Sequence, residues 1–202
     1  MVPLDPYHLK NDYQSRMDSI YPVLLAVPAH TRTFKGREKV AFLSKHAREA
    51  LKISAALQKT DLPKLLKDKR GAPIPLNGVF WSISHKSEYV GGVVAPSRTG
   101  IDIEKIRPVS QGLFKKTALP EEWSLAPGTN QERLFFRFWT AKEAVLKSTG
   151  TGISELTKCR IFRIPDDTHT VLKYQNRILC VEHYFFCDHI ATVIKNDLPI
   201  RW

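Results

Sequence analysis

The pattern of apolar and polar positions divides the first half of the chain into a strand, a helix and two further strands. Residues 23–27 form a short apolar run, which predicts a buried strand. Residues 67–78 contain Pro73 and Pro75 and predict a loop. Residues 79–84 and 89–95 predict two strands joined by a tight turn. Residues 37–58 predict one long helix, because apolar side chains recur there at roughly helical spacing, at Val40, Leu43, Ala47, Ala50, Leu51 and Leu57.

The second half begins with alternating apolar and polar positions at residues 100–106, which predict another strand. Residues 107–129 are less regular and predict a helical turn. Residues 131–148 carry an apolar stripe that stops at Gly150 and Gly152, and they predict a second long helix. Four short strands are predicted after it, at residues 158–164, 169–174, 177–185 and 189–195.

The order of elements therefore recurs at a spacing of roughly 100 residues. We expect an α+β protein built from two similar halves, residues 1–98 and 99–202, related by a pseudo-twofold axis. A chance recurrence of a common element order is the alternative. The chain of 202 residues can bury a substantial core, and its 43% of hydrophobic and 25% of charged residues are ordinary for a soluble globular protein.

The charge of the chain is strongly positive and unevenly distributed. The formal net charge is +11, and the segment from Arg32 to Arg70 holds eight lysines and four arginines against four acidic residues. Such a basic segment predicts an anionic partner, which is nucleic acid, phosphate groups or an acidic protein. A solvated basic face is the alternative.

The cysteines and the hydropathy pattern favour a reduced, cytoplasmic protein. Cys159, Cys180 and Cys187 are odd in number and have no C-x-x-C spacing, which argues against a disulfide framework or a zinc site. No apolar run approaches the roughly eighteen residues that a membrane span needs. The start of the chain, which includes Pro3 and Asp5, is not typical of a signal peptide.

Asp102 and Glu104 stand two positions apart on a predicted strand. Side chains two apart lie on one face of a strand, so Ile101 and Ile103 would enter the core and the carboxylates would converge opposite to them. Two oxygen ligands with open remaining positions suit magnesium, which keeps water and takes phosphate oxygens. An exposed acidic pair bound to nearby basic residues is the alternative, because surface carboxylates are common.

Glu143 and Lys147 stand four positions apart on the second predicted helix, so their side chains share one face. A plain salt bridge between them is the alternative. The same helix is rich in aromatic residues, and a charge on a largely buried helix is costly unless it is paired or bound. Glu143 is therefore a candidate third carboxylate for the metal, and Lys147 a candidate for binding phosphate.

Two further groups are candidates for binding phosphate. Ser84 and His85 end a strand, where a histidine beside a serine can donate to a phosphate oxygen; a structural histidine is the alternative. The serine is not part of a Gly-x-Ser-x-Gly nucleophile motif. The helix at residues 37–58 is basic, with a solvated face as the alternative, and its candidate phosphate ligands are Lys39, Lys45, Arg48 and Lys52.

Two blocks of the sequence resemble the signature blocks of the phosphopantetheinyl transferase superfamily, in its long, surfactin-synthetase-type branch. The block G-[IV]-D-x-E of that family stands here at residues 100–104, and the block [FW]-[ST]-x-K-E-[AS]-x-x-K at residues 139–147. They occur in order and roughly 35 residues apart. Residues 82–85 and 150–153 also resemble the branch's N-[IV]-S-H and G-x-G-[LI] blocks, so the resemblance spans about residues 23–195.

This resemblance implies two similar α+β halves with an active site between them. It implies an enzyme, a 4'-phosphopantetheinyl transferase or holo-[acyl-carrier-protein] synthase. Such an enzyme moves the 4'-phosphopantetheine moiety of coenzyme A to a serine of an apo carrier protein and releases adenosine 3',5'-bisphosphate. The implied partners are coenzyme A and an acidic acyl or peptidyl carrier protein, and the implied assembly is a monomer.

The resemblance also implies roles for single residues. Asp102, Glu104 and Glu143 would hold Mg2+ or Mn2+, and the catalytic residues would be Asp102, Glu143 and Lys147. Glu143 is a candidate for helping to deprotonate the attacking serine. The remaining implied contacts are with coenzyme A: its phosphates would be bound by Lys147, Ser84 and His85, and the phosphate on its ribose by Lys39 and Arg48.

The sequence departs from the branch in the loop before the Ser-His block. Ala72 stands where the branch often has a lysine that contacts coenzyme A, and Lys69 or Arg70 is a candidate replacement. The main functional alternative is a basic nucleic-acid-binding protein or metal-dependent nuclease, which leaves the second signature block unexplained. A non-catalytic binding domain is a third hypothesis and predicts that the acidic residues are dispensable.

Overall fold

A computed structural model describes residues 17–202; the residues that bear on the signal-peptide expectation lie outside this range. The described strands form two antiparallel sheets and one small hairpin, with strand orders β1-β5-β4 and β6-β10-β9-β8-β7 in the two sheets. The first sheet comprises β1 (Val23–Ala26), β4 (Phe80–His85) and β5 (Tyr89–Ala95). The second comprises β6 (Ile101–Lys105), β7 (Arg160–Arg163), β8 (His169–Tyr174), β9 (Arg177–Phe186) and β10 (His189–Lys195).

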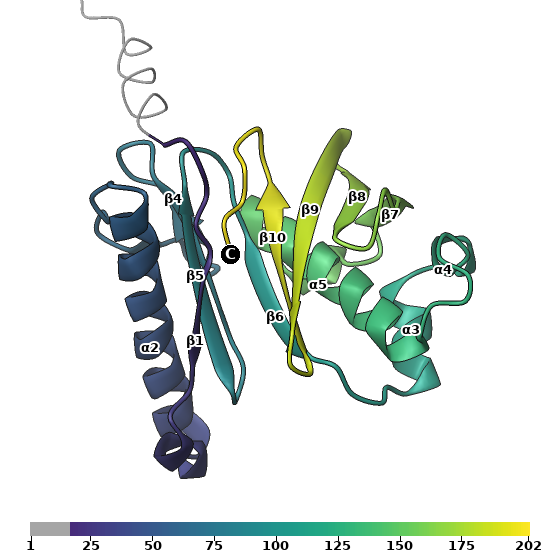
Figure 1. Cartoon of the computed structure of the whole chain (residues 1–202), viewed down its shortest axis with the longest axis horizontal. Helices are drawn as coiled ribbons and strands as arrows, with labels where there is room; N and C mark the ends of the chain where they lie inside the picture. The colour runs from purple at the N-terminus through teal and green to yellow at the C-terminus, as the bar shows by residue number, and fades with distance from the viewer. Residues whose placement is uncertain (1–16) are drawn as a thin grey trace, which may run out of the picture.

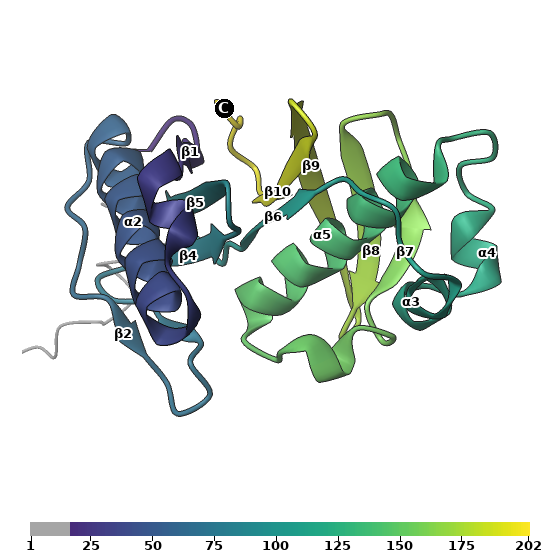
Figure 2. The ribbon, with the colours of Figure 1, turned by 90° about the horizontal axis from the view of Figure 1, so that it is seen from below.

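The two sheets lie between two long helices (Figures 1 and 2). Helix α2 (Gly36–Leu57) covers the outer face of the first sheet, and helix α5 (Gln131–Thr149) packs against the second. A core that includes Val93, Ile101 and Val193 fills the space between the sheets. The prediction of a mixed α+β fold is confirmed.

Helix α2 begins and ends within one residue of its prediction. Its buried face includes Leu43, Ala47 and Leu51, as the spacing indicates. Val40 and Leu57 were predicted on the same apolar stripe but are exposed, because they lie toward the helix ends while the sheet covers the middle. The close packing in the middle depends on a glycine of β5, since a Cβ at position 92 would lie 2.6 Å from the Leu51 nitrogen.

The prediction of a plain loop at residues 67–78 was wrong. Strands β2 (Leu66–Lys67) and β3 (Pro73–Ile74) pair there as a short hairpin. Its turn is held by Asp68, whose carboxylate accepts hydrogen bonds from the backbone N–H groups of Arg70 and Ala72 at 2.8 Å each. These contacts are local, so the hairpin forms without the apolar alternation by which a strand is predicted.

The second half follows the predicted elements closely. The region 107–129 contains two short helices, α3 (Gln111–Thr117) and α4 (Pro120–Trp123). The four strands after α5 begin and end within two residues of the predicted ranges, and short 3-10 helices are added at Ala29–Thr33 and Ile153–Glu155.

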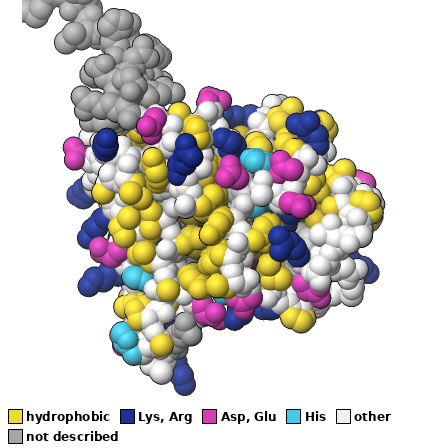
Figure 3. Space-filling view, in the orientation of Figure 1, with side chains coloured by type: hydrophobic (Ala, Val, Ile, Leu, Met, Phe, Trp, Pro, Cys, Tyr) yellow, Lys and Arg dark blue, Asp and Glu magenta, His cyan; other side chains and the backbone are white. Residues whose placement is uncertain are grey.

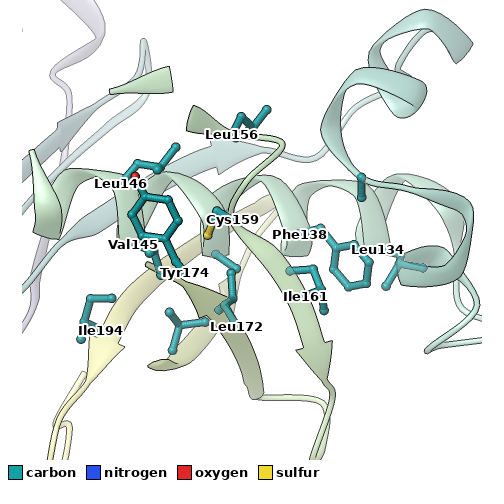
Figure 4. Packing of buried hydrophobic residues seen from close by; sticks show 13 residues of the cluster. Leu134, Phe138, Val145, Leu146, Leu156, Cys159, Ile161, Leu172, Tyr174 and Ile194 are labelled. Carbon is teal, nitrogen blue, oxygen red and sulfur yellow. The ribbon is translucent and has the colours of Figure 1, made fainter. Parts of the chain in front are cut away.

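Helix α5 carries the main core of the second half. Its N-terminus is capped by Asn130, whose side chain accepts a hydrogen bond from the Arg133 nitrogen, and it ends at Gly150 in a left-handed conformation, as the sequence predicts. Apolar side chains of this helix meet those of the second sheet in one cluster (Figure 4), which includes Leu134, Phe138, Val145, Leu146, Ile161, Leu172, Tyr174 and Ile194.

The two sheets meet along the edges of β4 and β6. Instead of a backbone ladder, two serine hydroxyls of β4 complete the hydrogen bonding of β6: Ser82 Oγ accepts from the Ile101 nitrogen and Ser84 Oγ from the Ile103 nitrogen, both at 3.2 Å. We call this contact the serine seam. It satisfies backbone groups that burial would otherwise leave unpaired. Within residues 17–202, no helix has the length and apolar character that a membrane span requires.

Candidate active site

The acidic pair on β6 has the predicted orientation. Ile101 and Ile103 are fully buried, and a Cβ atom at Gly91 of β5 would meet both, so these side chains face the first sheet. Asp102 and Glu104 therefore lie on the opposite face of β6, toward α5. Both are buried, so the alternative of an exposed acidic pair was wrong.

A glycine brings α5 close to this strand. A Cβ at Gly100 would lie only 2.0 Å from the Ala144 carbonyl oxygen, so any side chain there would displace the helix. The close approach lets Lys147 Nζ donate to Asp102 Oδ1 at 2.7 Å and to the Ile101 carbonyl at 3.0 Å. Lys147 thus pairs with Asp102, not with Glu143 as the salt-bridge alternative proposed.

Asp102 has one satisfied and one unsatisfied oxygen. Its Oδ1 accepts hydrogen bonds from Lys147 and, at 2.9 Å, from Ser84 Oγ. Its Oδ2 is buried and has no hydrogen-bond partner. A buried acceptor without a partner is costly, so this oxygen is suited to a ligand that the protein alone does not supply.

Glu104 is held by two residues that sequence reasoning did not assign to the site. Lys86 Nζ lies 2.7 Å from its Oε1, and Trp139 Nε1 donates to the same oxygen at 3.1 Å. A sequence signal existed for both: Lys86 directly follows Ser84-His85, and Trp139 is four positions before Glu143 on one helix face.

The electrostatic environment joins these groups into one site. Burial raises the pKa of Glu104 and of Glu143 above the usual carboxyl value, and the charge of Asp102 raises both further. The pKa of His85 is lowered, first by burial and then by the positive charges of Lys147 and Lys86. The predicted residues Ser84, His85, Asp102, Glu104, Glu143 and Lys147 therefore share one electrostatic environment.

The donor set fits a divalent cation. Asp102, Glu104 and Glu143 offer carboxylate oxygens, the ligands that magnesium and manganese prefer. The free Asp102 Oδ2 can accept such an ion, and a positive charge would relieve the repulsion that raises the pKa of the two glutamates. In this structure each of the two carboxylates on β6 forms an ion pair with a lysine, Asp102 with Lys147 and Glu104 with Lys86.

Lys39 and Arg48, the residues predicted to bind the ribose phosphate, lie far apart along α2. Lys39 Nζ donates to Ser87 Oγ at 3.3 Å, in the turn that follows Ser84 and His85. Arg48 is exposed, about 14 Å further along the helix. Lys45 and Lys52 are exposed as well, and basic side chains gather along the α2 edge of the molecule (Figure 3).

The hairpin that contains Ala72 lies at the C-terminal end of α5. A Cβ at Gly150 would be 3.0 Å from the Ala72 side chain, so the hairpin is near the helix turn that carries Lys147. Of the two candidate replacements for the missing lysine, Arg70 lies 3.6 Å from Asp68 within the same turn. Lys69 is exposed.

A second acidic group lies at the turns of the β4–β5 and β9–β10 hairpins and was not predicted. Among residues 17–202, Glu88, Asp188 and His189 bring potential metal-ligand atoms within 4.8 Å of one another. Lys105 Nζ already lies 2.7 Å from Glu88 Oε1 and 3.0 Å from Asp188 Oδ2. Because this lysine offsets the acidic charge, we assign no metal to the group.

A chain of buried hydrogen bonds fixes α5 on the second sheet. Thr140 Oγ1 donates to the Phe136 carbonyl at 2.8 Å, so it accepts from Thr192 Oγ1 at 2.6 Å. Thr192, whose hydrogen is used in this way, accepts from His183 Nδ1 at 2.8 Å. Because Thr192 is the residue paired with Asp102 across the sheet, their side chains share one face and the chain of bonds lies beside the acidic site.

The same chain continues to a buried arginine. His183 Nε2 accepts from Thr170 Oγ1 at 2.8 Å, and Thr170 accepts from Arg137 Nε at 3.1 Å. The direction of every bond assigns His183 to the neutral form with hydrogen on Nδ1. Burial, followed by the charge of Arg137, lowers the pKa of His183 well below 6.5 and so favours this form.

Comparisons with known proteins agree with this arrangement. The sequence profile described as the 4'-phosphopantetheinyl transferase superfamily matches residues 98–199, which are 102 of the 202 residues. The chain is 36% identical over 111 residues to the 4'-phosphopantetheinyl transferase HetI of Nostoc sp. strain PCC 7120, covering 50% of this chain and 47% of that protein.

Two Bacillus proteins are also similar. The chain is 32% identical over 96 residues to the 4'-phosphopantetheinyl transferase psf-1 of Bacillus pumilus, covering 46% of this chain and 41% of that protein. It is 29% identical over 131 residues to the 4'-phosphopantetheinyl transferase Sfp of Bacillus subtilis strain 168, covering 62% and 54%. The chain thus spans about half the length of the curated relatives it matches.

The profile match covers both signature blocks, on β6 and on α5, and with them the acidic site. This chain belongs to the 4'-phosphopantetheinyl transferase superfamily. The comparisons give no support to the alternative of a nucleic-acid-binding protein or nuclease.

Proposed function

We propose that this chain transfers the 4'-phosphopantetheine arm of coenzyme A to a serine hydroxyl of an apo carrier protein. The serine oxygen forms a bond to the phosphorus that bears the pantetheine, and the bond from that phosphorus to the bridging pyrophosphate oxygen breaks. The products are the holo carrier protein and adenosine 3',5'-bisphosphate. Because the nucleophile comes from the carrier, the chain needs no catalytic serine or cysteine of its own.

The buried carboxylate of Asp102 is the observation that carries the proposal. One of its oxygens has no partner, and it lies beside Lys147 in a site where burial and mutual repulsion raise the pKa of Glu104 and Glu143. Burying such a group without a ligand costs stability and gives no packing benefit. The arrangement is therefore suited to a bound cation and an anionic substrate.

Each residue has a role in this proposal. A magnesium or manganese ion held by Asp102, Glu104 and Glu143 would supply stabilisation of negative charge on the pyrophosphate. Lys147 adds a positive charge for the phosphates and His85 donates a hydrogen bond to them, while Ser84, predicted to do the same, gives its hydroxyl hydrogen to Asp102 Oδ1 and orients that carboxylate. Glu143 helps to remove the serine proton. Lys39 and Arg48 bind the phosphate on the ribose.

We propose an acidic acyl or peptidyl carrier protein as the partner, because coenzyme A phosphates can balance only part of the net charge of +11. We further propose a cytoplasmic monomer with two similar halves that meet between residues 98 and 99. The common strand order supports the two halves: in each sheet the last strand lies between the first strand and the strand before the last. Light scattering tests whether the protein is a monomer. If the positive charge steers the acidic carrier, its affinity should fall as salt is added, and a salt-independent affinity would contradict this docking.

The proposal is tested by incubating the protein with coenzyme A, magnesium and a panel of apo carrier proteins. Mass spectrometry should find one phosphopantetheine group added to at least one carrier, with adenosine 3',5'-bisphosphate formed in equal amount. Chelation should stop the reaction and added magnesium or manganese should restore it. Full transfer in excess chelator, or by Asp102→Asn, would contradict the assigned site.

A further inference from the structure

A lysine occupies the carboxylate that is expected to bind metal on β6. Lys86 Nζ lies 2.7 Å from Glu104 Oε1, the distance of a direct ion pair. This lysine extends from the turn after β4, beside His85, and belongs to the opposite half of the molecule from Glu104. The contact therefore joins the two halves through the acidic site.

The two lysines of the site are held differently. Lys147 donates both to Asp102 and to the Ile101 carbonyl, and its side chain is 29% exposed. The Lys86 ammonium has its carboxylate contact with Glu104, and its side chain is 40% exposed. Lys86 can therefore move its charge into water at low cost, whereas Lys147 would leave a backbone carbonyl behind.

A divalent cation and Lys86 need the same carboxylate. Both are positive, and both use the lone pairs of a Glu104 oxygen that also accepts from Trp139 Nε1. In the absence of the ion, the Lys86 charge offsets the burial and the repulsion from Asp102 that raise the pKa of Glu104. A cation of higher charge can replace it and leave the bond to Trp139 in place.

We propose that Lys86 is an internal competitor for the metal: it holds Glu104 in the metal-free protein and must leave when the ion binds. Lys86 is thus a positioning residue that sets how tightly the site takes a divalent cation. This inference rests on the proposed function, because it concerns the metal site assigned to the transferase.

The test is a direct titration of the full chain with Mn2+, followed by electron paramagnetic resonance of the free ion, without coenzyme A or carrier. Lys86→Met should bind Mn2+ about three- to fivefold more tightly than the unchanged protein, as expected for loss of a competing, partly exposed ion pair. The matched control is Lys158→Met, which removes the same charge from another short, partly exposed ion pair, with Glu155 at 2.8 Å, that contains none of the assigned ligands. Its Mn2+ affinity should change less than about twofold, because a charge that does not touch the ligands is screened.

Equal affinities of Lys86→Met and Lys158→Met, or weaker binding by Lys86→Met, would overturn the competitor role. Asp102→Asn attributes the measured ion to this site, because it should abolish the tight binding. Tight Mn2+ binding that persists in Asp102→Asn would overturn both the competitor role and the proposed metal site. Asp102-dependent binding that Lys86→Met tightens, in a protein that modifies no carrier, would support the competitor role and contradict the proposed transfer.

Discussion

Lys142 and Lys147 lie in the same signature block of α5, yet their environments are opposite. The Lys142–Glu122 pair is fully enclosed, with side chains 0% and 2% exposed. Lys147 is 29% exposed and pairs with Asp102 of β6. Both pairs are short, at 2.9 and 2.7 Å, so distance alone does not distinguish them.

The difference lies in the remaining hydrogen-bond capacity. Glu122 uses both oxygens: Oε1 accepts from Lys142 and from the Ile161 nitrogen, and Oε2 accepts from the Leu119 nitrogen. Lys142 also donates to the Thr117 carbonyl. Asp102, in contrast, keeps one buried oxygen without a partner. A fully satisfied buried pair fixes structure, whereas an unsatisfied one beside an exposed lysine provides a place for a ligand.

The largest expected effect is on stability, from Lys142→Met. This change removes one of the two cations beside the buried Glu122, which keeps Arg160 Nε 2.9 Å from its Oε2, and costs about 3 kcal/mol of unfolding free energy. Urea unfolding measures the loss. Transfer activity per folded molecule should remain near normal, because Lys142 faces α4 and not the acidic site.

The double variant Lys142→Met with Glu122→Gln is the control for this prediction. It removes both charges and keeps an acceptor oxygen for the Ile161 nitrogen but places an amide NH2 opposite the Leu119 nitrogen, so it should recover part of the lost stability. A stable Lys142→Met protein that is inactive would contradict the division between the two lysines.

Lys147→Met should show the opposite pattern. The rate of transfer should fall at least about 100-fold, the usual loss when one group that stabilises transition-state charge is removed. The unfolding free energy should fall by about 1–2 kcal/mol, less than for Lys142→Met, since Asp102 is buried but the lysine of this pair is partly exposed and solvent weakens the pair. A carrier modification assay and a melting curve on the same sample decide this, and normal transfer would remove Lys147 from the active site.

A smaller effect is expected on the pH dependence of stability, from the neutral His183 beside the acidic site. Because its pKa is depressed in the folded protein, the unfolded chain takes up a proton more readily as the pH falls below about 6.5. The stability associated with neutral His183 is therefore complete above that pH and declines below it. The slope is at most about 1.4 kcal/mol per pH unit.

The comparison of unfolding curves at pH 7.5 and 5.5 for the wild-type chain and His183→Asn isolates this contribution. The variant should lose less stability on acidification than the wild type. Nitrogen chemical shifts of the imidazole should report hydrogen on Nδ1 throughout. A protonated imidazole at neutral pH, or equal acid sensitivity in both proteins, would be incompatible with the assigned hydrogen-bond chain.

Most of the fold could be predicted because its elements are long and strongly periodic. The stripe of α5 and the alternation along β6 follow from helical and strand periods, and β8 and β10 have the predicted bounds. The β2–β3 hairpin was missed, because it is held by one aspartate and local backbone contacts and not by buried alternation.

The sequence was enough to predict which residues form the candidate site, but not which lysine pairs with which carboxylate. The spacing of Asp102 and Glu104 gives their common face, and their neighbours Ile101 and Ile103 explain its direction. The partner of each carboxylate depends on residues far away in sequence: Lys86 reaches Glu104 from a turn of the other sheet, and Lys147 reaches Asp102 only because Gly100 has no side chain.

The serine seam makes the hydrogen exchange of two backbone amides a specific measure of contact between the two sheets. The N–H groups of Ile101 and Ile103 are bonded to side-chain hydroxyls of β4, whereas the amides on the other edge of β6 belong to an uninterrupted ladder with β10. Separation of the two sheets would expose the first two while each sheet stays intact. Their rate of deuterium uptake would then report how often the two sheets separate, independently of global unfolding.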